Sequence, residues 1–189
     1  VAYSICVKLA QNGCKRFHLV SRDLNRNNDL IQYLKNNYEV NITQEVNDLL
    51  LDNAFKRNSL LKIGFYDLYL IASGSLGDGD LARVDAREAL RINSVNYINL
   101  LPLITTITNN SRINSRGSLW GFSSVASDRG RPSNYHYGAA KAGLTTFCEG
   151  ILLRCQNKPF SIRIIKAGYI DTPMAKSAPS FLCVSPEKV

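Results

Sequence analysis

The sequence predicts an α/β fold, and two features of its 189 residues carry that prediction. Apolar runs of strand length alternate along the chain with longer segments whose apolar residues recur at helical spacing. One run, residues 67–72, is nearly continuously apolar, which is typical of a strand buried on both faces of a parallel sheet. The length and a hydrophobic content of 45% fit one globular domain, so we expect residues 1–189 to form a single domain.

Composition and charge narrow the class of protein. Five cysteines, an odd number without metal-ligand spacing, favour reduced thiols in a cytoplasmic protein over a disulfide framework. No apolar run approaches the roughly 18 residues of a membrane span and no signal peptide opens the chain, so we expect no membrane insertion. The net charge of +8 comes from scattered Lys and Arg, which argues against nucleic acid as a partner and favours anionic ligands such as a phosphorylated cofactor.

The first elements are expected to be a helix, a strand and a second helix. Residues 1–11 carry apolar side chains on one face, as an amphipathic helix does. Residues 14–20 then alternate into a short β-rich run. The next helix begins near Leu24 and includes residues 30–35, and Asp23 is expected to cap it.

The middle of the chain predicts two strands and two helices. A short strand at residues 38–42 is followed by Thr43, which resembles the N-cap of a helix that continues through Leu61. The apolar strand described above comes next. Residues 82–107 predict one long helix, which Pro102 should kink.

The last third of the chain continues the alternation. A surface loop at residues 109–117 leads into a strand at 119–124, and a long helix follows at 137–156. Residues 160–165 predict another strand. Residues 174–181 are expected to form a mobile lid over the substrate.

The chemistry of the sequence centres on Tyr137 and Lys141. These residues stand one turn apart on the same face of the predicted helix. A phenol titrates near pH ~10 and exchanges protons poorly at neutrality, whereas a nearby lysine favours the phenolate. Ser124 ends the preceding strand, and a loop of about ten residues would bring its hydroxyl to the phenol. A Tyr and a Lys at this spacing are usually an ordinary surface pair, so Ser124 is what indicates a site.

A serine at a strand end followed by Tyr-x-x-x-Lys resembles the short-chain dehydrogenase/reductase family, and the resemblance covers nearly the whole chain. It implies a Rossmann-type doubly wound parallel sheet with helices on both faces, a nicotinamide cofactor, and hydride transfer to or from a carbonyl or alcohol carbon. By this resemblance Tyr137 exchanges the proton and Ser124 orients the substrate oxygen. Lys141 would lower the pKa of Tyr137 and hold the nicotinamide ribose. Asn93 would hold a water in a proton relay, or simply be a buried polar residue that bends its helix.

The resemblance also implies where the cofactor binds. Ser21 and Arg22 lie where a dinucleotide fold meets the adenosine ribose, and Arg22 favours the 2′-phosphate of NADPH. Asp23 leaves NAD possible, and Asn41 would reach the adenine. The remaining expected cofactor contacts are Ala72, Ser73, Gly74, Tyr137, Lys141, Gly168, Ile170 and Thr172.

Members of the family normally begin with another strand and a Gly-rich turn, so we expect the chain to be truncated at both ends. The Leu-Gly-Asp stretch at residues 76–78, with residues 132–134, also resembles the subgroup that includes the decaprenylphosphoryl-2-keto-pentose reductase. This narrower resemblance implies a keto-sugar or a lipid-linked keto-sugar as substrate. A generic ketone or a 3-oxoacyl thioester is the alternative within the class.

A nucleotide-sensing or scaffold protein that lost the chemistry is the alternative from another class. The presence of Ser124, Tyr137, Lys141 and Asn93 argues against it, because a protein that only binds needs no proton machinery. Apolar residues on more than one side of the Tyr137 helix and of the Asn93 helix predict a homodimer or a homotetramer.

Overall fold

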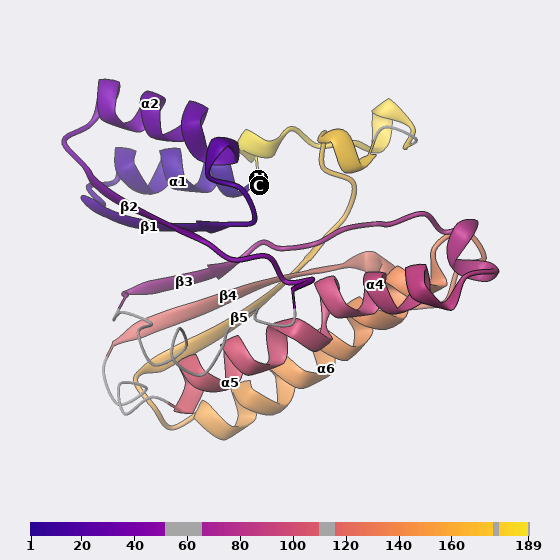
Figure 1. The fold of residues 1–189 in the computed structure, drawn as a ribbon. Helices are drawn as coiled ribbons and strands as arrows, with labels where there is room; N and C mark the ends of the chain where they lie inside the picture. Colours follow the sequence, from indigo (N-terminus) through magenta and orange to yellow (C-terminus); the bar gives the residue numbers. More distant parts are fainter. Residues whose placement is uncertain (52–65, 110–115, 176–177, 189) are drawn as a thin grey trace. The chain divides into compact units, whose positions relative to one another are not determined.

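The structure is a computed structural model, and it describes residues 1–51, 66–109, 116–175 and 178–188. Its contacts group into two compact units. Unit 1 comprises Val1–Ala54 with Tyr169–Val189, and unit 2 comprises Phe55–Gly168. Each unit combines parallel strands with helices, as the α/β prediction requires (Figure 1). The single domain expected from the sequence stays a prediction.

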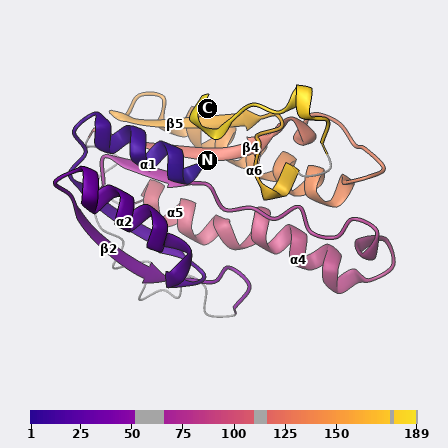
Figure 2. The same ribbon diagram turned by 90° about the horizontal axis from the view of Figure 1, so that it is seen from above.

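Unit 1 contains two helices and a two-stranded parallel sheet. The elements are α1 (Ala2–Gln11), β1 (Arg16–Ser21), α2 (Asn28–Asn37) and β2 (Asn41–Val46). The strands pair from Arg16 opposite Asn41 to Ser21 opposite Val46. The two helices lie side by side (Figure 2). Apolar side chains of α1, β1 and α2 form a buried core, namely Cys6, Ala10, Phe17, Leu30 and Leu34. Ile42 of β2 packs against this core.

The start of β2 differs from the prediction. Tyr38 still belongs to the end of α2, since its N–H donates to the carbonyl of Leu34 at 2.9 Å. Thr43 is therefore not a helix N-cap. It lies inside β2, where its hydroxyl is 2.8 Å from Nδ1 of His18 on the paired strand. A β-branched residue suits a strand better than a helix. Most of the helix predicted after it falls on residues 52–65, outside the described residues.

Unit 2 contains a three-stranded parallel sheet of order β3-β4-β5. The strands are β3 (Leu68–Ile71), β4 (Gly117–Ser124) and β5 (Phe160–Ala167). The helices are α4 (Ala86–Asn96), α5 (Leu101–Asn109) and α6 (Tyr135–Cys155), and they lie along one face of this sheet (Figure 1). Because the strands are parallel, their carboxyl ends meet at one edge of the sheet, where ligands of open α/β folds bind.

The long helix predicted over residues 82–107 is wrong as a single element. α4 ends before Tyr97, whose φ of −147° is not helical, and α5 begins only at Leu101. Pro102 does not kink a helix, because it lies in the first turn of α5. A proline is tolerated there because its missing N–H would have no partner within the helix.

The core of unit 2 places α6 directly on β4. Leu119 of the strand and Leu144 of the helix are almost completely buried. Gly138 permits a close approach, because a Cβ at this position would lie only 2.7 Å from the carbonyl oxygen of Ala126. The fold thus brings the first turn of α6 to the carboxyl end of β4.

Candidate active site

Ser124 and Tyr137 meet at the carboxyl edge of the sheet in unit 2. Ser124 is the last residue of β4, and its Oγ accepts a hydrogen bond from the N–H of Ala126 at 3.1 Å. Tyr137 lies in the first turn of α6, and its hydroxyl is hydrogen-bonded to that of Ser124. Since Ser124 already accepts a backbone bond, its proton is available to the phenol or to a substrate oxygen.

Lys141 lies one turn further along α6 and is only 2% exposed. Its Nζ donates to the carbonyl of Phe122 at 2.9 Å and to that of Ser73 at 3.4 Å. The same nitrogen lies 5.9 Å from the centre of the Tyr137 ring. An ammonium carries three N–H groups, so one donor remains for a ligand hydroxyl. Lys141 therefore joins the turn after β3, the end of β4 and the tyrosine.

Burial sets the pKa of both residues. It raises the pKa of the Tyr137 phenol, an effect that the hydrogen bond from Ser124 opposes. It also lowers the pKa of Lys141 to about 8, partly offset by the nearby Cys148. The expectation that Lys141 lowers the pKa of Tyr137 is not met in this structure, because its ammonium points at the carbonyls of Phe122 and Ser73. The phenol is therefore protonated at neutral pH.

Two asparagines of α4 have different surroundings. Asn93 is half-buried, and its Nδ2 donates to the carbonyl of Ala89 in the preceding turn at 2.9 Å. Asn96 is fully buried, and its Nδ2 donates to Ser75 O at 2.7 Å and to Ile92 O at 2.8 Å. Its Oδ1 accepts from Ser75 N–H at 3.1 Å. Asn96 thus holds the backbone after β3 in both directions, while Asn93 bonds only within its helix in the contacts described.

Asn96 is the asparagine that lies next to the catalytic candidates. A Cβ on Gly74 would come within 3.2 Å of Asn96 Oδ1 and 3.5 Å of Lys141 Nζ. A side chain at this position would therefore press on Asn96 and lie in contact with Lys141. Asn96 was not among the predicted site residues. Its position four residues after the apolar Ile92, which is buried, indicates that both side chains lie on the inner face of α4.

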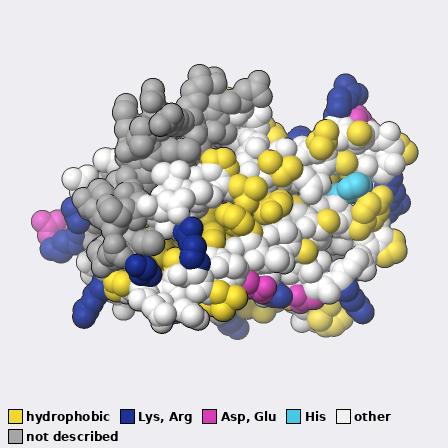
Figure 3. Space-filling view, turned by 90° about the horizontal axis from the view of Figure 1, so that it is seen from below, with side chains coloured by type: hydrophobic (Ala, Val, Ile, Leu, Met, Phe, Trp, Pro, Cys, Tyr) yellow, Lys and Arg dark blue, Asp and Glu magenta, His cyan; other side chains and the backbone are white. Residues whose placement is uncertain are grey.

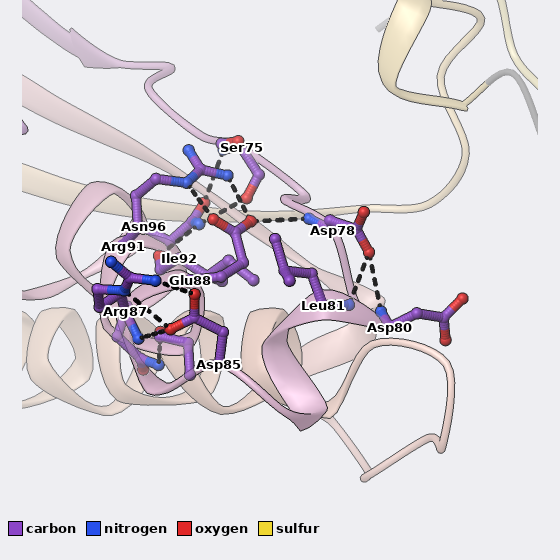
Figure 4. A network of polar contacts seen from close by, with 12 residues as sticks. Ser75, Asp78, Asp80, Leu81, Asp85, Arg87, Glu88, Arg91, Ile92 and Asn96 are labelled. Carbon is purple, nitrogen blue, oxygen red and sulfur yellow. Dashed lines mark hydrogen bonds and ion pairs between the residues drawn. The ribbon is translucent and has the colours of Figure 1, made fainter.

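The segment that follows Gly74 is held by a polar network (Figure 4). The carboxylate of Glu88 accepts the N–H of Asp78 at 2.9 Å and pairs with Arg91 at 2.5 and 2.7 Å. Asp78 in turn accepts the N–H groups of Asp80 and Leu81. The bond from Arg91, followed by that from Asp78, lowers the pKa of Glu88 to about 2. The carboxylate therefore stays charged, and the turn stays fixed, at any ordinary pH.

The other cofactor candidates of unit 2 lie at the same edge of the sheet. Ala72, Ser73 and Gly74 directly follow β3 and are exposed, and Gly168 follows β5. Of these, Ser73 contacts the site through its carbonyl, which accepts from Lys141. The turn after β3 and the catalytic candidates are thus brought together.

In unit 1, Ser21 ends β1, one residue beyond the predicted strand, and Arg22 directly follows it. Ser21 Oγ donates to the carbonyl of Asp23 at 2.7 Å, and the Arg22 side chain is exposed. Asp23 also caps the short 3₁₀ helix that follows, by accepting the N–H of Asn25 at 3.0 Å. The capping role predicted for Asp23 is confirmed, and Arg22 is left facing solvent.

Asn41 does not lie near Ser21. It begins β2 at the opposite end of the strand pair, about 17 Å away along the strands. Asn47, just after β2, is at the correct edge instead, since its N–H donates to Ser21 O at 2.9 Å. Its Oδ1 is buried and has no hydrogen-bond partner among the described residues. The prediction for Asn41 depended on ending the strand at residue 42, and β2 runs on to Val46.

Ile170 and Thr172 also belong to unit 1. Ile170 forms a parallel bridge with Val184, and Thr172 Oγ1 donates to Ile170 O at 3.2 Å. The predicted lid contains short 3₁₀ helices at Pro173–Ala175 and Ser180–Leu182. Whether the cofactor residues of unit 1 reach those of unit 2, and whether the lid moves, stay predictions.

The described residues contain neither a metal-ligand cluster nor a membrane-spanning helix. Within the described residues, no three or more His, Cys, Asp or Glu side chains lie together in a group that could hold a metal ion. None of the helices in the described part of the chain combines the length and apolarity that a bilayer crossing requires.

The sequence model of the family described as short chain dehydrogenase matches residues 1–182. This chain belongs to the short-chain dehydrogenase family. A curated relative, an uncharacterized oxidoreductase of Mycobacterium tuberculosis, is 37% identical over 121 residues, which cover 64% of this chain and 49% of the relative. A 3-oxoacyl-[acyl-carrier-protein] reductase of Chlamydia trachomatis is 26% identical over 69% of this chain and 52% of its own length. This short-chain dehydrogenase thus spans about half the length of the curated relatives it matches.

Solved structures of other proteins share the fold. A bulky-bulky ketone specific alcohol dehydrogenase from Comamonas testosteroni superimposes with a TM-score of 0.84 at 18% identity, over 98% of this chain and 73% of that one. The actinorhodin polyketide ketoreductase, solved with NADPH, gives 0.77 at 18% identity, over 93% and 68% of the two chains. The Rossmann-type fold is therefore shown for this short-chain dehydrogenase.

Proposed function

We propose that this protein is an NADPH-dependent reductase that converts a carbonyl group to an alcohol. The observation that carries the proposal is the convergence of Ser124, Tyr137 and Lys141 at the carboxyl edge of the sheet. A protonated phenol hydrogen-bonded to a serine, with a buried ammonium one turn away, is a device for giving a proton to an oxygen.

The residues present fit a nicotinamide dinucleotide. An N–H of Lys141 beyond the two that bond to carbonyls in the described contacts suits a ribose hydroxyl, and the turn at residues 72–74 is exposed and can meet a ligand. In unit 1 the buried, unpartnered Oδ1 of Asn47 suits the amino group of adenine, so we propose Asn47 in place of Asn41. The bound cofactor supplies the hydride that the carbonyl carbon receives.

The side chains of the protein handle the proton. Tyr137 donates its proton to the carbonyl oxygen, and the raised pKa keeps the phenol in the form that can do so. Ser124 donates a hydrogen bond to the same oxygen and so orients it. Lys141, whose Nζ lies 5.9 Å from the centre of the Tyr137 ring, offers an N–H to the nicotinamide ribose. Asn96 holds the turn after β3, and we propose it rather than Asn93 as the asparagine of the site.

NADPH rather than NADH is proposed because of Arg22. Its exposed guanidinium follows the carboxyl end of β1, where a 2′-phosphate would be recognised. The cytoplasm is the proposed location, supported by five free cysteines, since a reducing compartment keeps thiols in that state.

The proposed substrate is a keto-sugar or a lipid-linked keto-sugar. A 3-oxoacyl thioester is the alternative, supported by the relative whose printed name is a 3-oxoacyl-carrier-protein reductase. Loss of NADPH absorbance with a panel of keto-sugars, 3-oxoacyl thioesters and simple ketones tests both. We expect turnover with a keto-sugar, and faster turnover with the thioester would replace that substrate by the alternative.

The same assay separates a reductase from a nucleotide sensor. Binding is followed by the fluorescence of NADPH, and turnover by its oxidation. A protein that binds NADPH, yet oxidises it with none of these carbonyl compounds, would be a sensor and would overturn the proposed reaction.

We also propose a homodimer, or a tetramer built on it, through the outer face of α4 and α6. Hydrophobic side chains gather across this face (Figure 3). Leu90 and Leu153 are each 63% exposed, although they are large and apolar. Phe147 is half-buried against Tyr97, so Leu153→Glu is the better test than a change at Phe147. We expect the variant to be monomeric by light scattering, and a monomeric wild type at micromolar concentration would refute the assembly.

A further inference from the structure

The seam between β4 and α6 is lined by small residues at both ends. Near the N-terminus of α6, Gly138 meets the backbone of Ala126. Further along, a Cβ on Gly121 would lie 3.9 Å from Sγ of Cys148. Such contacts set how close the helix comes to the strand. They do not set its position along the strand, because apolar packing has no preferred direction.

Between these two points lies a buried polar contact. Thr145 Oγ1 donates to the carbonyl of Lys141 at 2.8 Å, and Ser123 Oγ lies 2.6 Å from Thr145 Oγ1. Ser123 Oγ is also 3.2 Å from the same carbonyl. The two residues are only 4% and 5% exposed. Because each hydroxyl has one proton, the bonds form a chain from Ser123 to Thr145 to the Lys141 carbonyl.

This chain of hydrogen bonds fixes the register of α6 on β4. A shift of the helix by one turn would leave the buried hydroxyl of Ser123 without its two partners, which proteins avoid, while Thr145 would keep its bond to Lys141 O within the helix. Ser123 directly precedes Ser124, and Thr145 lies one turn after Lys141. The contact therefore also sets how far Ser124 lies from Tyr137, and it keeps Lys141 Nζ against the carbonyl of Phe122.

We propose that Ser123 and Thr145 are positioning residues for the carbonyl reduction, which act by holding the helix that carries Tyr137 and Lys141 in one register on the strand that carries Ser124. The inference rests on the proposed function. Both hydroxyls are used within the seam, so they act through the three site residues and not on the substrate.

The experiment compares Thr145→Val with Thr108→Val. Thr108 is a matched control, because it is 1% exposed and its Oγ1 donates to Ile104 O, also at 2.8 Å, in α5. Its hydroxyl bonds only within that helix in the contacts described. We expect Thr145→Val to lower kcat about tenfold with KM nearly unchanged, since small displacements of reacting groups are costly. Thr108→Val should stay within about twofold of the wild type, at a similar loss of stability.

Rescue by the conservative variant adds a second criterion. Thr145→Ser keeps the hydroxyl and should restore most of kcat. Ser123→Ala should lower kcat as Thr145→Val does, and the double variant should be no worse than either, because both break one chain of bonds. Equal kcat values for Thr145→Val and Thr108→Val would overturn the inference, and so would a Thr145→Ser variant as slow as Thr145→Val.

A readout that needs no turnover separates this inference from the proposed function. The ultraviolet titration of Tyr137 is obtained as wild type minus Tyr137→Phe, with the same subtraction in each variant background. Since the bond from Ser124 lowers the pKa of Tyr137, we expect a further rise in Thr145→Val and none in Thr108→Val. An unchanged titration in Thr145→Val overturns the register role. Absence of turnover in the wild type overturns the proposed reaction alone.

Discussion

The candidate catalytic side chains of unit 2 and Arg22 of unit 1, which is proposed to select the cofactor, differ in how firmly their own unit holds them. Lys141 is 2% exposed and donates to two backbone carbonyls. Arg22 is exposed and follows the end of a strand. A buried, bonded side chain is part of the fold, so its replacement changes rate and stability together. An exposed side chain can be replaced at no cost to the fold, so only ligand preference should change.

The largest expected effect follows from removal of the phenol. Tyr137→Phe deletes one hydroxyl and almost no volume, so we expect kcat to fall about 10³-fold or more. The dissociation constant of NADPH, measured by fluorescence, should change by less than about twofold. A variant that retains most of its turnover would remove Tyr137 from the role of proton donor.

Burial of Lys141, a residue of the candidate site, makes the free energy of unfolding depend on pH. Its pKa of about 8 in the folded protein lies below its ordinary 10.5, so the unfolded chain binds more protons between these values. Wild-type stability should therefore rise across this window, by about 3 kcal/mol relative to Lys141→Met. Urea unfolding of both proteins at about pH 7.5 and pH 10 measures the difference, in which the other titrating groups cancel. Parallel pH profiles would show that burial does not perturb this lysine.

Arg22 is the exposed side chain of the comparison, and its replacement should change cofactor preference without changing stability. Arg22→Ala should raise the KM for NADPH about tenfold, because one charge-assisted contact with the 2′-phosphate is lost. The KM for NADH and the melting temperature should not change. Arg26→Ala, at a second exposed arginine in the same segment, is the matched control. A wild type that already prefers NADH would show that Arg22 does not select the cofactor.

The smallest effect concerns the turn after β3. The pKa of Glu88, about 2 against an ordinary 4.5, means that its contribution is present above pH 4.5 and is lost as the pH falls toward 2. At pH ~6 we expect Glu88→Gln to be about 1 kcal/mol less stable than the wild type, and the gap should close in acid. Asp128→Asn should show a smaller gap, since the Asp128 side chain is 51% exposed beside Lys166, against 10% for Glu88. Equal losses of stability in the two variants would show that the burial of Glu88 does not strengthen its ion pair.

Local spacing in the sequence was enough to find the centre of the site. Tyr137 and Lys141 stand one helical turn apart, and Ser124 ends an apolar run, so each position follows from the period of its own element. The strand at β3 was predicted because its run of residues is nearly continuously apolar, as in a buried parallel strand.

Contacts between elements could not be predicted in the same way. Asn93 and Asn96 lie on one short helix, and only the packing of α4 shows that Asn96 reaches the turn after β3. Asn41 and Asn47 differ only by the register of β2 against β1, which the local pattern did not determine. The predicted long helix failed at Tyr97 because tertiary packing overrode a pattern that remained apolar on both sides of the break.

The burial of Cys148 has a consequence for chemical reagents. This residue is 1% exposed, and burial raises the pKa of its thiol to about 11. Only the thiolate attacks alkylating agents and oxidants, so Cys148, one of the two cysteines on the helix of Tyr137, stays inert at neutral pH. Such reagents reach the half-buried Cys14 and Cys183 of unit 1 first. A thiol-directed compound that slows the proposed carbonyl reduction at neutral pH is therefore expected to act at a cysteine other than Cys148.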